Sequence, residues 1–181
     1  MSQHLPKILN VSVVAKSRIF EIQAVDLQFS NGELRTYERF KPASRAGVMV
    51  LPIEDGELIM VKEYAVGTER YELGFVKGLM EVGESIEQSA NRELQEEIGL
   101  SAKEFVFLRT VQTAVGFMNT QMHILLATDF SASKLEGDEP EPLQIVRYPL
   151  AKLDELLGDP HFYEARNLTA LYCLRDYLAK K

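Results

Sequence analysis

The chain has 181 residues, of which 46% are hydrophobic and 26% are charged, and its formal net charge is −7 at pH 7. This length and composition fit an ordinary soluble protein with one fully cored domain and room for a small extension. The acidic balance argues against a broad nucleic-acid-binding surface, and it means that a phosphate-bearing substrate must be met by local cations.

The chain shows neither a secretion signal nor an apolar stretch of membrane-spanning length. We therefore expect a cytoplasmic protein with no membrane partner. The lone Cys173 cannot form an internal disulfide, and its helical context predicts a small buried hydrophobe rather than a reactive thiol.

The first predicted element is a β-hairpin over residues 18–40, where apolar and polar residues alternate around Asn31-Gly32. An amphipathic hairpin needs a partner surface, either its own domain or another subunit. We expect residues 1–44 to form an N-terminal hairpin extension and residues 45–181 to form the main domain.

The main domain begins with strands, continues with a helix and returns to strands. Strand patterns cover residues 48–53, 58–61, 69–75, 105–113, 121–128 and 145–148, and helical periodicity covers residues 85–98, 150–157 and 163–178. Pro160 predicts the start of the last helix. The one composition break is an acidic, proline-bearing loop over residues 135–142.

Local signals define the helix over residues 85–98. Ser85 and Gln88 form a capping box, and Gly99 supplies a C-terminal stop. At about 100° per residue, Glu93 and Glu97 lie on one line near the apolar row, while Glu96 lies to one side. Two carboxylates therefore lean toward the protein.

These acidic side chains repel one another and need a positive charge nearby. Arg92 can reach Glu96 across one turn, but one guanidinium does not balance four or five acids. A divalent cation does, and carboxylate oxygens are the ligands that Mg²⁺ and Mn²⁺ prefer. The helix therefore predicts a site for one of these ions.

Residues 78–100 satisfy the pattern G-x5-E-x7-R-E-U-x-E-E-x-G-U, where U is a bulky aliphatic residue. The segment thus resembles the signature of the Nudix hydrolases. The resemblance implies an α/β fold, an α/β/α sandwich around a mixed central sheet. It also implies hydrolysis of a nucleoside diphosphate linked to a second group, and many relatives use such an N-terminal extension to form a homodimer.

The resemblance also implies roles for single residues. Glu93 and Glu97 are the expected principal metal ligands, with Glu96 as a further ligand or water anchor and the Lys77 carbonyl as another oxygen. Arg92 is expected to orient a catalytic carboxylate. The general base is either Glu93 or a loop glutamate, Glu139 or Glu141, and we favour the loop.

Outside this signature the chain is similar to Nudix hydrolases of ADP-containing compounds, from Arg18 to Leu178. Three segments carry the similarity: residues 63–78, 135–143 and 164–167. It implies cleavage of ADP-ribose, NADH or diadenosine polyphosphates to AMP, with Arg70, Tyr71 and Glu72 holding the adenosine half. Residues 113–119 lack the proline usual in ADP-ribose enzymes, which leaves the conjugate open.

Two other functions are weighed against this one. A Nudix-fold sensor could bind an ADP-containing ligand without cleaving it, but such domains tend to lose the acids that Glu93, Glu96 and Glu97 retain here. A hydrolase of capped RNA would need a basic groove, which the net charge disfavours. We therefore expect a nucleotide substrate and no nucleic-acid partner.

Overall fold

The computed structural model describes residues 4–180, and these divide into two compact units. One unit comprises the chain up to Ser44 together with Gln112–Thr120, and the other comprises Arg45–Val111 and Gln121–Lys181. The predicted domain division after residue 44 stays a prediction. No helix among residues 4–180 is both long and apolar enough to cross a membrane.

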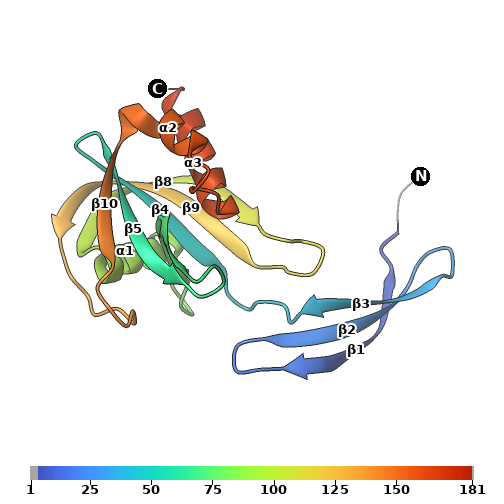
Figure 1. Ribbon diagram of the computed structural model, residues 1–181. Helices are drawn as coiled ribbons and strands as arrows, with labels where there is room; N and C mark the ends of the chain where they lie inside the picture. The colour runs from blue at the N-terminus through green and yellow to red at the C-terminus, as the bar shows by residue number, and fades with distance from the viewer. Residues whose placement is uncertain (1–3, 181) are drawn as a thin grey trace. The chain divides into compact units, whose positions relative to one another are not determined.

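The N-terminal unit contains an antiparallel sheet of three strands, β1 (Lys7–Lys16), β2 (Glu21–Gln28) and β3 (Leu34–Phe40), in that order (Figure 1). The predicted hairpin is formed by β2 and β3, and Gly32 takes the positive φ of 86° that its turn requires. Strand β1 was not predicted. All ten of its residues are exposed in the structure, so burial of one face does not impose a strict alternation of apolar and polar residues on this strand.

The second unit contains a seven-stranded mixed sheet with three α-helices. The main path runs β10-β5-β4-β9-β8 (Figure 1). In addition, β6 pairs with β5 and β7 pairs with β4. The pair β4 and β9 is parallel, whereas β5 is antiparallel to β4, β6 and β10. The elements in chain order are β4 (Gly47–Glu54), β5 (Glu57–Ala65), β6 (Arg70–Gly74), β7 (Val76–Leu79), α1 (Ile86–Glu97), β8 (Leu100–Gln112), β9 (Gln121–Ala132), β10 (Gln144–Pro149), α2 (Leu153–Gly158) and α3 (Ala165–Leu178).

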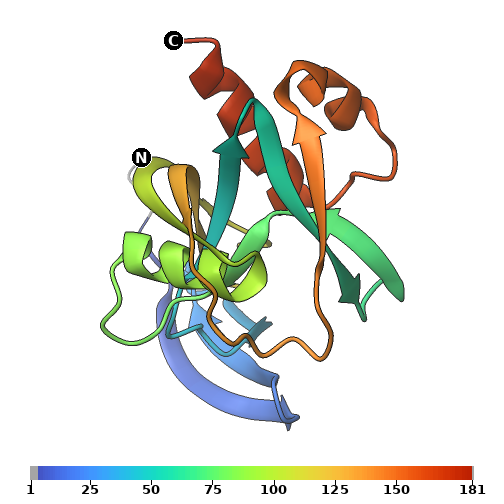
Figure 2. The ribbon, with the colours of Figure 1, turned by 90° about the vertical axis from the view of Figure 1, so that its left-hand side faces the viewer.

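Alternating residues of the central strands supply two cores. On one face, Met49 and Leu58 pack with buried residues of α2 and α3. On the other face, Val48 and Ile59 pack with Ala90 and Leu94 of α1. Side chains of a strand point alternately to its two faces, so α1 lies on one side of the sheet and α2 and α3 lie on the other. The predicted α/β/α sandwich is confirmed, and Figure 2 shows α1 crossing one face.

The capping box predicted for α1 is present in the structure. The Ser85 hydroxyl accepts a hydrogen bond from the Gln88 N–H, the Gln88 side chain accepts one from the Ser85 N–H, and Gly99 follows with a φ of 72°. The prediction that Pro160 starts the last helix was wrong. Helix α3 begins at Ala165 because the side chain of Glu164 caps it by accepting from the Asn167 N–H at 2.8 Å.

Candidate active site

A cleft of about 940 Å³ lies where the ends of β5 and β7 meet α1 and the acidic loop between β9 and β10. The loop runs beside α1 (Figure 2), and the Leu135 N–H donates to the Gln95 carbonyl at 3.2 Å. Among the residues that line the cleft are all of the predicted metal ligands and both candidate loop bases, which are Lys77, Glu93, Glu96, Glu97, Glu139 and Glu141.

The two carboxylates that lean toward the protein are nearly enclosed. Glu93 is 7% exposed and Glu97 is 8% exposed. One oxygen of Glu97, Oε1, accepts a hydrogen bond from the Lys77 N–H at 3.0 Å, whereas the buried Oε2 has no partner. The carboxylate of Glu93 lies directly over Gly78, where an added Cβ would approach it to 2.1 Å. A glycine is therefore needed at position 78 to leave room for Glu93.

Burial sets the protonation of this pair. The pKa of Glu97 is raised to about 8, chiefly because burial disfavours the charged form; the charges of Glu93 and Glu139 add to this shift, and Lys77 opposes it. Burial also raises the pKa of Glu93, although the neighbouring Arg92 opposes the shift. The positive charges near Glu93 and Glu97 are therefore too few to offset the burial of these two carboxylates.

Arg92 connects the start of α1 to its carboxylates. Its Nε donates to Glu84 at 2.8 Å, and its Nη1 donates to Glu93 at 2.7 Å and to Glu96 at 2.9 Å. Its Nη2 also donates to the Leu79 carbonyl at 2.9 Å, and the bond with Glu84 leads the contacts that raise the pKa of Arg92. The guanidinium is therefore fully engaged in holding carboxylates and the loop.

Glu84 fixes the loop that precedes α1. Its Oε2 accepts a hydrogen bond from the Glu81 N–H at 2.8 Å. Its bond with Arg92 holds the pKa of Glu84 down to about 2. The carboxylate is therefore ionised and occupied at neutral pH.

The carboxylates of α1 suit a divalent cation. Among residues 4–180, no three acidic, histidine or cysteine side chains are grouped closely enough to hold a metal as they stand, and Glu93 and Glu96 share Arg92 instead. The unpartnered oxygen of Glu97 nevertheless leaves a buried acceptor without a donor, which is costly unless a cation or proton meets it. Hard cations prefer these oxygen donors.

The loop glutamates lie in different surroundings. A side chain added at Gly137 would meet both the Glu139 carboxylate and Glu96 of α1, and the charge of Glu139 raises the pKa of both Glu93 and Glu97. Glu141 instead accepts a hydrogen bond from the Tyr71 hydroxyl. The structure therefore brings Glu139, but not Glu141, to the carboxylates of α1.

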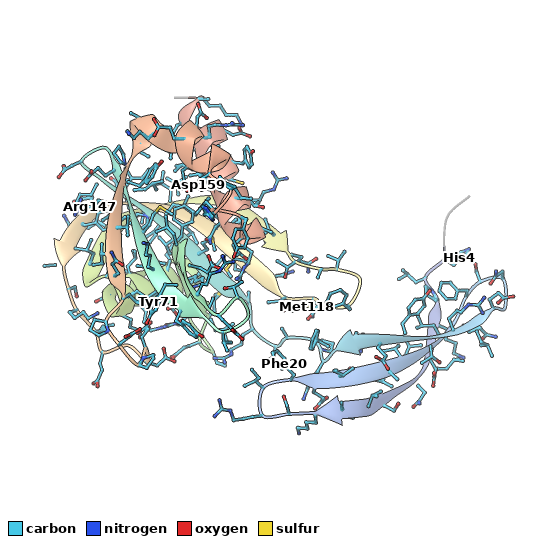
Figure 3. The ribbon with its side chains drawn as sticks, viewed as in Figure 1. His4, Phe20, Tyr71, Met118, Arg147 and Asp159 are labelled. Atoms are coloured by element: carbon cyan, nitrogen blue, oxygen red, sulfur yellow. The ribbon has the colours of Figure 1, made fainter. Side chains whose placement is uncertain are left out.

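The three residues predicted to hold adenosine separate between two cavities. Tyr71 lines the cleft, while Arg70 and Glu72 line a neighbouring cavity of about 330 Å³ that also contains Tyr71 and Lys62. Figure 3 labels Tyr71 and Asp159, which both line this second cavity. The cleft and the second cavity therefore share a wall.

Several cavity residues were not predicted from the sequence. In the second cavity the Tyr163 hydroxyl accepts from Arg70 at 2.8 Å and donates to Glu72 at 2.6 Å. In the cleft, Glu63 binds the Lys77 ammonium, and Lys62 and Tyr64 line the wall. The period-2 alternation of the 58–61 strand, extended by three residues, could have identified Lys62 and Tyr64, whereas no local signal links Tyr163 to Arg70.

Comparison with known proteins agrees with this site. The sequence matches the NudE-type Nudix hydrolase N-terminal domain over residues 6–39 and the NUDIX domain over residues 43–171. It is 53% identical to the ADP compounds hydrolase NudE of Escherichia coli (strain K12), covering 96% of this chain and 93% of the relative. It is 30% identical to the ADP-ribose pyrophosphatase of Bacillus subtilis (strain 168), covering 93% and 95% respectively.

The fold gives the same assignment. A crystal structure of an ADP compounds hydrolase superposes with a TM-score of 0.97 and 51% sequence identity, covering 99% of this chain and 97% of that chain. The structural match spans both units of the chain and includes the sheet that carries the cleft. The chain therefore belongs to the Nudix hydrolase family and is a pyrophosphohydrolase.

Proposed function

We propose that the protein is a metal-dependent pyrophosphohydrolase that cleaves ADP-containing compounds to AMP and a second phosphorylated product. The observation that supports this function best is the buried carboxylate pair Glu93 and Glu97, which lines a large cleft and leaves one oxygen without a partner. A sensor that only binds its ligand has no need of such a costly pair.

Enzymes of this family generally require a divalent metal, and we assign Mg²⁺ here, with Mn²⁺ as a substitute. Glu93 and Glu97 would be its main ligands, Glu96 a further ligand or water anchor, and the Lys77 carbonyl an additional oxygen. When bound, such an ion neutralises phosphate charge and acidifies water. The same positive charge would satisfy the free oxygen of Glu97 and lower the raised pKa of both carboxylates.

Arg92 acts through the carboxylates rather than on the phosphate. All of its donors with described partners point to Glu84, Glu93, Glu96, Ser89 or the Leu79 carbonyl. Glu84 in turn holds Arg92 and the Glu81 N–H. We therefore assign positioning roles to both residues, with Glu93 as the carboxylate that Arg92 orients.

Glu139 is our choice for the general base. It lines the same cleft as Glu93 and Glu97, close to Glu96 across Gly137, and its charge raises the pKa of both carboxylates, so we assign it the activation of a water beside them. Glu141 is bonded to Tyr71 and is better suited to hold that ring in place. Glu93 remains the alternative base.

The substrates follow from the cleft and from the relatives. ADP-ribose, NADH and diadenosine polyphosphates share an AMP half joined through a pyrophosphate, and the relatives are named for ADP compounds and ADP-ribose. A cleft of about 940 Å³ lies at the upper end of the usual range for small-molecule sites. We propose that Tyr71 contacts the adenosine half and that Arg70 and Glu72 contribute from the adjoining cavity.

We also propose that the protein is a homodimer that uses its N-terminal sheet. That sheet exposes several large apolar side chains, among them Ile8, Val11, Val13, Val14 and Tyr37. Exposed apolar surface and free strand edges both favour pairing with another chain. Sedimentation analysis of the full chain tests this assembly, and a monomer at micromolar concentration would reject it.

The function is tested by Mg²⁺-dependent release of AMP from ADP-ribose, NADH, diadenosine triphosphate and ADP-glucose, with a nucleoside triphosphate for comparison. We expect cleavage of the ADP compounds and little cleavage of the triphosphate. Tight binding of ADP-ribose without any product would reject hydrolysis and favour a sensor.

A further inference from the structure

We propose that Lys62, Tyr64 and Tyr71 form a binding site for a nucleoside 5′-phosphate, in which the two rings contact the base and Lys62 binds the phosphate. This inference rests on the proposed function, because the ligand is the AMP half of the substrate. Lys62 and Tyr64 are added here to the residues that recognise it.

The three side chains lie on one face of the sheet. Strands β5 and β6 pair with Tyr64 opposite Tyr71 and with Lys62 opposite Leu73. Leu58 and Met60 precede Lys62 at two-residue intervals, and they belong to the same core as Leu73. Because side chains alternate along a strand, Lys62, Tyr64 and Tyr71 continue that face beyond the core.

The two rings form an exposed aromatic pair inside a cavity. Their centroids are 5.6 Å apart at an interplanar angle of 67°, and Tyr64 and Tyr71 are 50% and 59% exposed. The Tyr71 ring is held by the bond from its hydroxyl to Glu141, while the Tyr64 hydroxyl has no hydrogen-bond partner in the described part of the chain. Nucleobases stack on such rings because every base has a π-face.

Lys62 is a half-buried cation whose charge is not used by the protein. Of the other cations that line the cleft, Lys77 binds Glu63, and Arg92 binds Glu84, Glu93 and Glu96. Arg45 also lines the cleft without a partner among the described residues, but it is exposed, whereas Lys62 is half-buried. Within residues 4–180, Lys62 has neither a hydrogen bond from its ammonium nor an ion pair. A half-buried lysine without a counter-ion suits an anionic ligand.

The position of Lys62 fits the geometry of a nucleotide. It lines both the cleft and the second cavity, and it is two residues from Tyr64 on the same strand face. Glu63, between them in the strand, binds Lys77 instead. The phosphate of a nucleotide stacked on the tyrosines could therefore meet Lys62 at the wall shared by the two cavities.

The test is isothermal titration of the metal-free full-length chain with AMP, adenosine and ribose 5-phosphate. Lys62→Gln should weaken AMP binding by about tenfold or more and leave adenosine binding unchanged, because only a charge-assisted phosphate contact is lost. Tyr64→Leu should weaken AMP and adenosine alike, by about tenfold, because stacking is lost.

Conservative variants separate binding from folding. Lys62→Arg and Tyr64→Phe keep the charge and the ring, so both should retain AMP affinity within about twofold. Lys103→Gln is the matched control, since it makes the same charge change at an exposed lysine that is paired with Asp129 away from the cleft lining. Wild-type AMP affinity in Lys62→Gln and Tyr64→Leu would overturn the site, as would no AMP binding by the wild type.

The result of the AMP-binding test can be interpreted separately from the result of the hydrolysis assay. If the wild type binds AMP through Lys62 but releases no AMP from any ADP compound, the proposed function fails while the nucleotide site stands. If it hydrolyses ADP-ribose and neither variant changes AMP affinity, the function stands and the nucleotide site fails.

Discussion

The two ends of helix α1 place glutamates in opposite environments. At its start, Glu84 has both oxygens occupied by Arg92 and the Glu81 N–H, and its pKa is lowered to about 2. Near its end, Glu97 is buried with one oxygen unpartnered, and its pKa is raised to about 8. A glutamate that holds structure is already satisfied, whereas one that awaits a ligand is not.

The largest expected effect on activity comes from removing the charge of Glu97, the carboxylate with an unpartnered oxygen. Glu97→Gln should lower kcat for ADP-ribose by about a thousandfold, because a charged metal ligand is worth several kcal/mol in the transition state. Circular dichroism should show an unchanged fold. Glu87→Gln is the matched control on an exposed position of the same helix, and near-wild-type turnover in Glu97→Gln would reject the assigned site.

A second comparison separates the two loop glutamates. Glu139→Gln should lower kcat by about a hundredfold, because general bases contribute this much or more. Glu141→Gln should chiefly raise KM, since Glu141 bonds to Tyr71 and not to the α1 carboxylates. Steady-state kinetics of the pair decide the assignment, and equal loss of kcat in both variants would contradict it.

At the N-terminal end of α1, both oxygens of Glu84 accept hydrogen bonds. Glu84→Gln should lower the free energy of unfolding by about 2 kcal/mol, because hydrogen bonds between charged groups are lost. We expect kcat to fall only about tenfold, as for other groups that orient ligands. Urea unfolding measures the first effect and turnover measures the second. A loss of activity as large as that of Glu97→Gln would mean that Glu84 acts on the reaction directly.

The contrast between the two ends explains what the sequence could predict. Helix α1 was predicted closely because its signals are local: Ser85 and Gln88 cap it, Gly99 ends it, and the spacing of Glu93 and Glu97 predicts their burial. The unpartnered oxygen of Glu97 could not be predicted, because it depends on where β7 lies.

The features that the sequence missed depend on distant contacts or lack periodicity. Tyr163 meets Arg70 across 93 positions of the chain. Glu139 and Glu141 lie in a loop where no repeat assigns side chains to a face, so only the folded loop separates them. Pro160 was a misleading signal, because the side chain of Glu164 is the cap that starts α3.

The smallest expected effect, a change of a few degrees in Tm, concerns the pH dependence of stability in metal-free protein. The folded-state pKa of Glu97 lies above its unfolded value of 4.5, so the folded state keeps a proton that the unfolded state loses. Glu97 therefore makes the protein less stable as pH rises from about 4.5 to about 8. The lowered pKa of Glu84 has the opposite sign, and its stabilisation is lost as pH falls from 4.5 toward 2.

Thermal unfolding of the wild type, Glu97→Gln and Glu84→Gln across this pH range distinguishes the two ends of α1. The Tm of Glu97→Gln should rise relative to the Tm of the wild type as the pH increases from 5 to 8. Mg²⁺ should remove that advantage, because it stabilises only the wild type. The difference in Tm between the wild type and Glu84→Gln should shrink below pH 4. If the Glu97→Gln difference were independent of pH, Glu97 would already be ionised in the folded protein, and the buried carboxylate would have a partner after all.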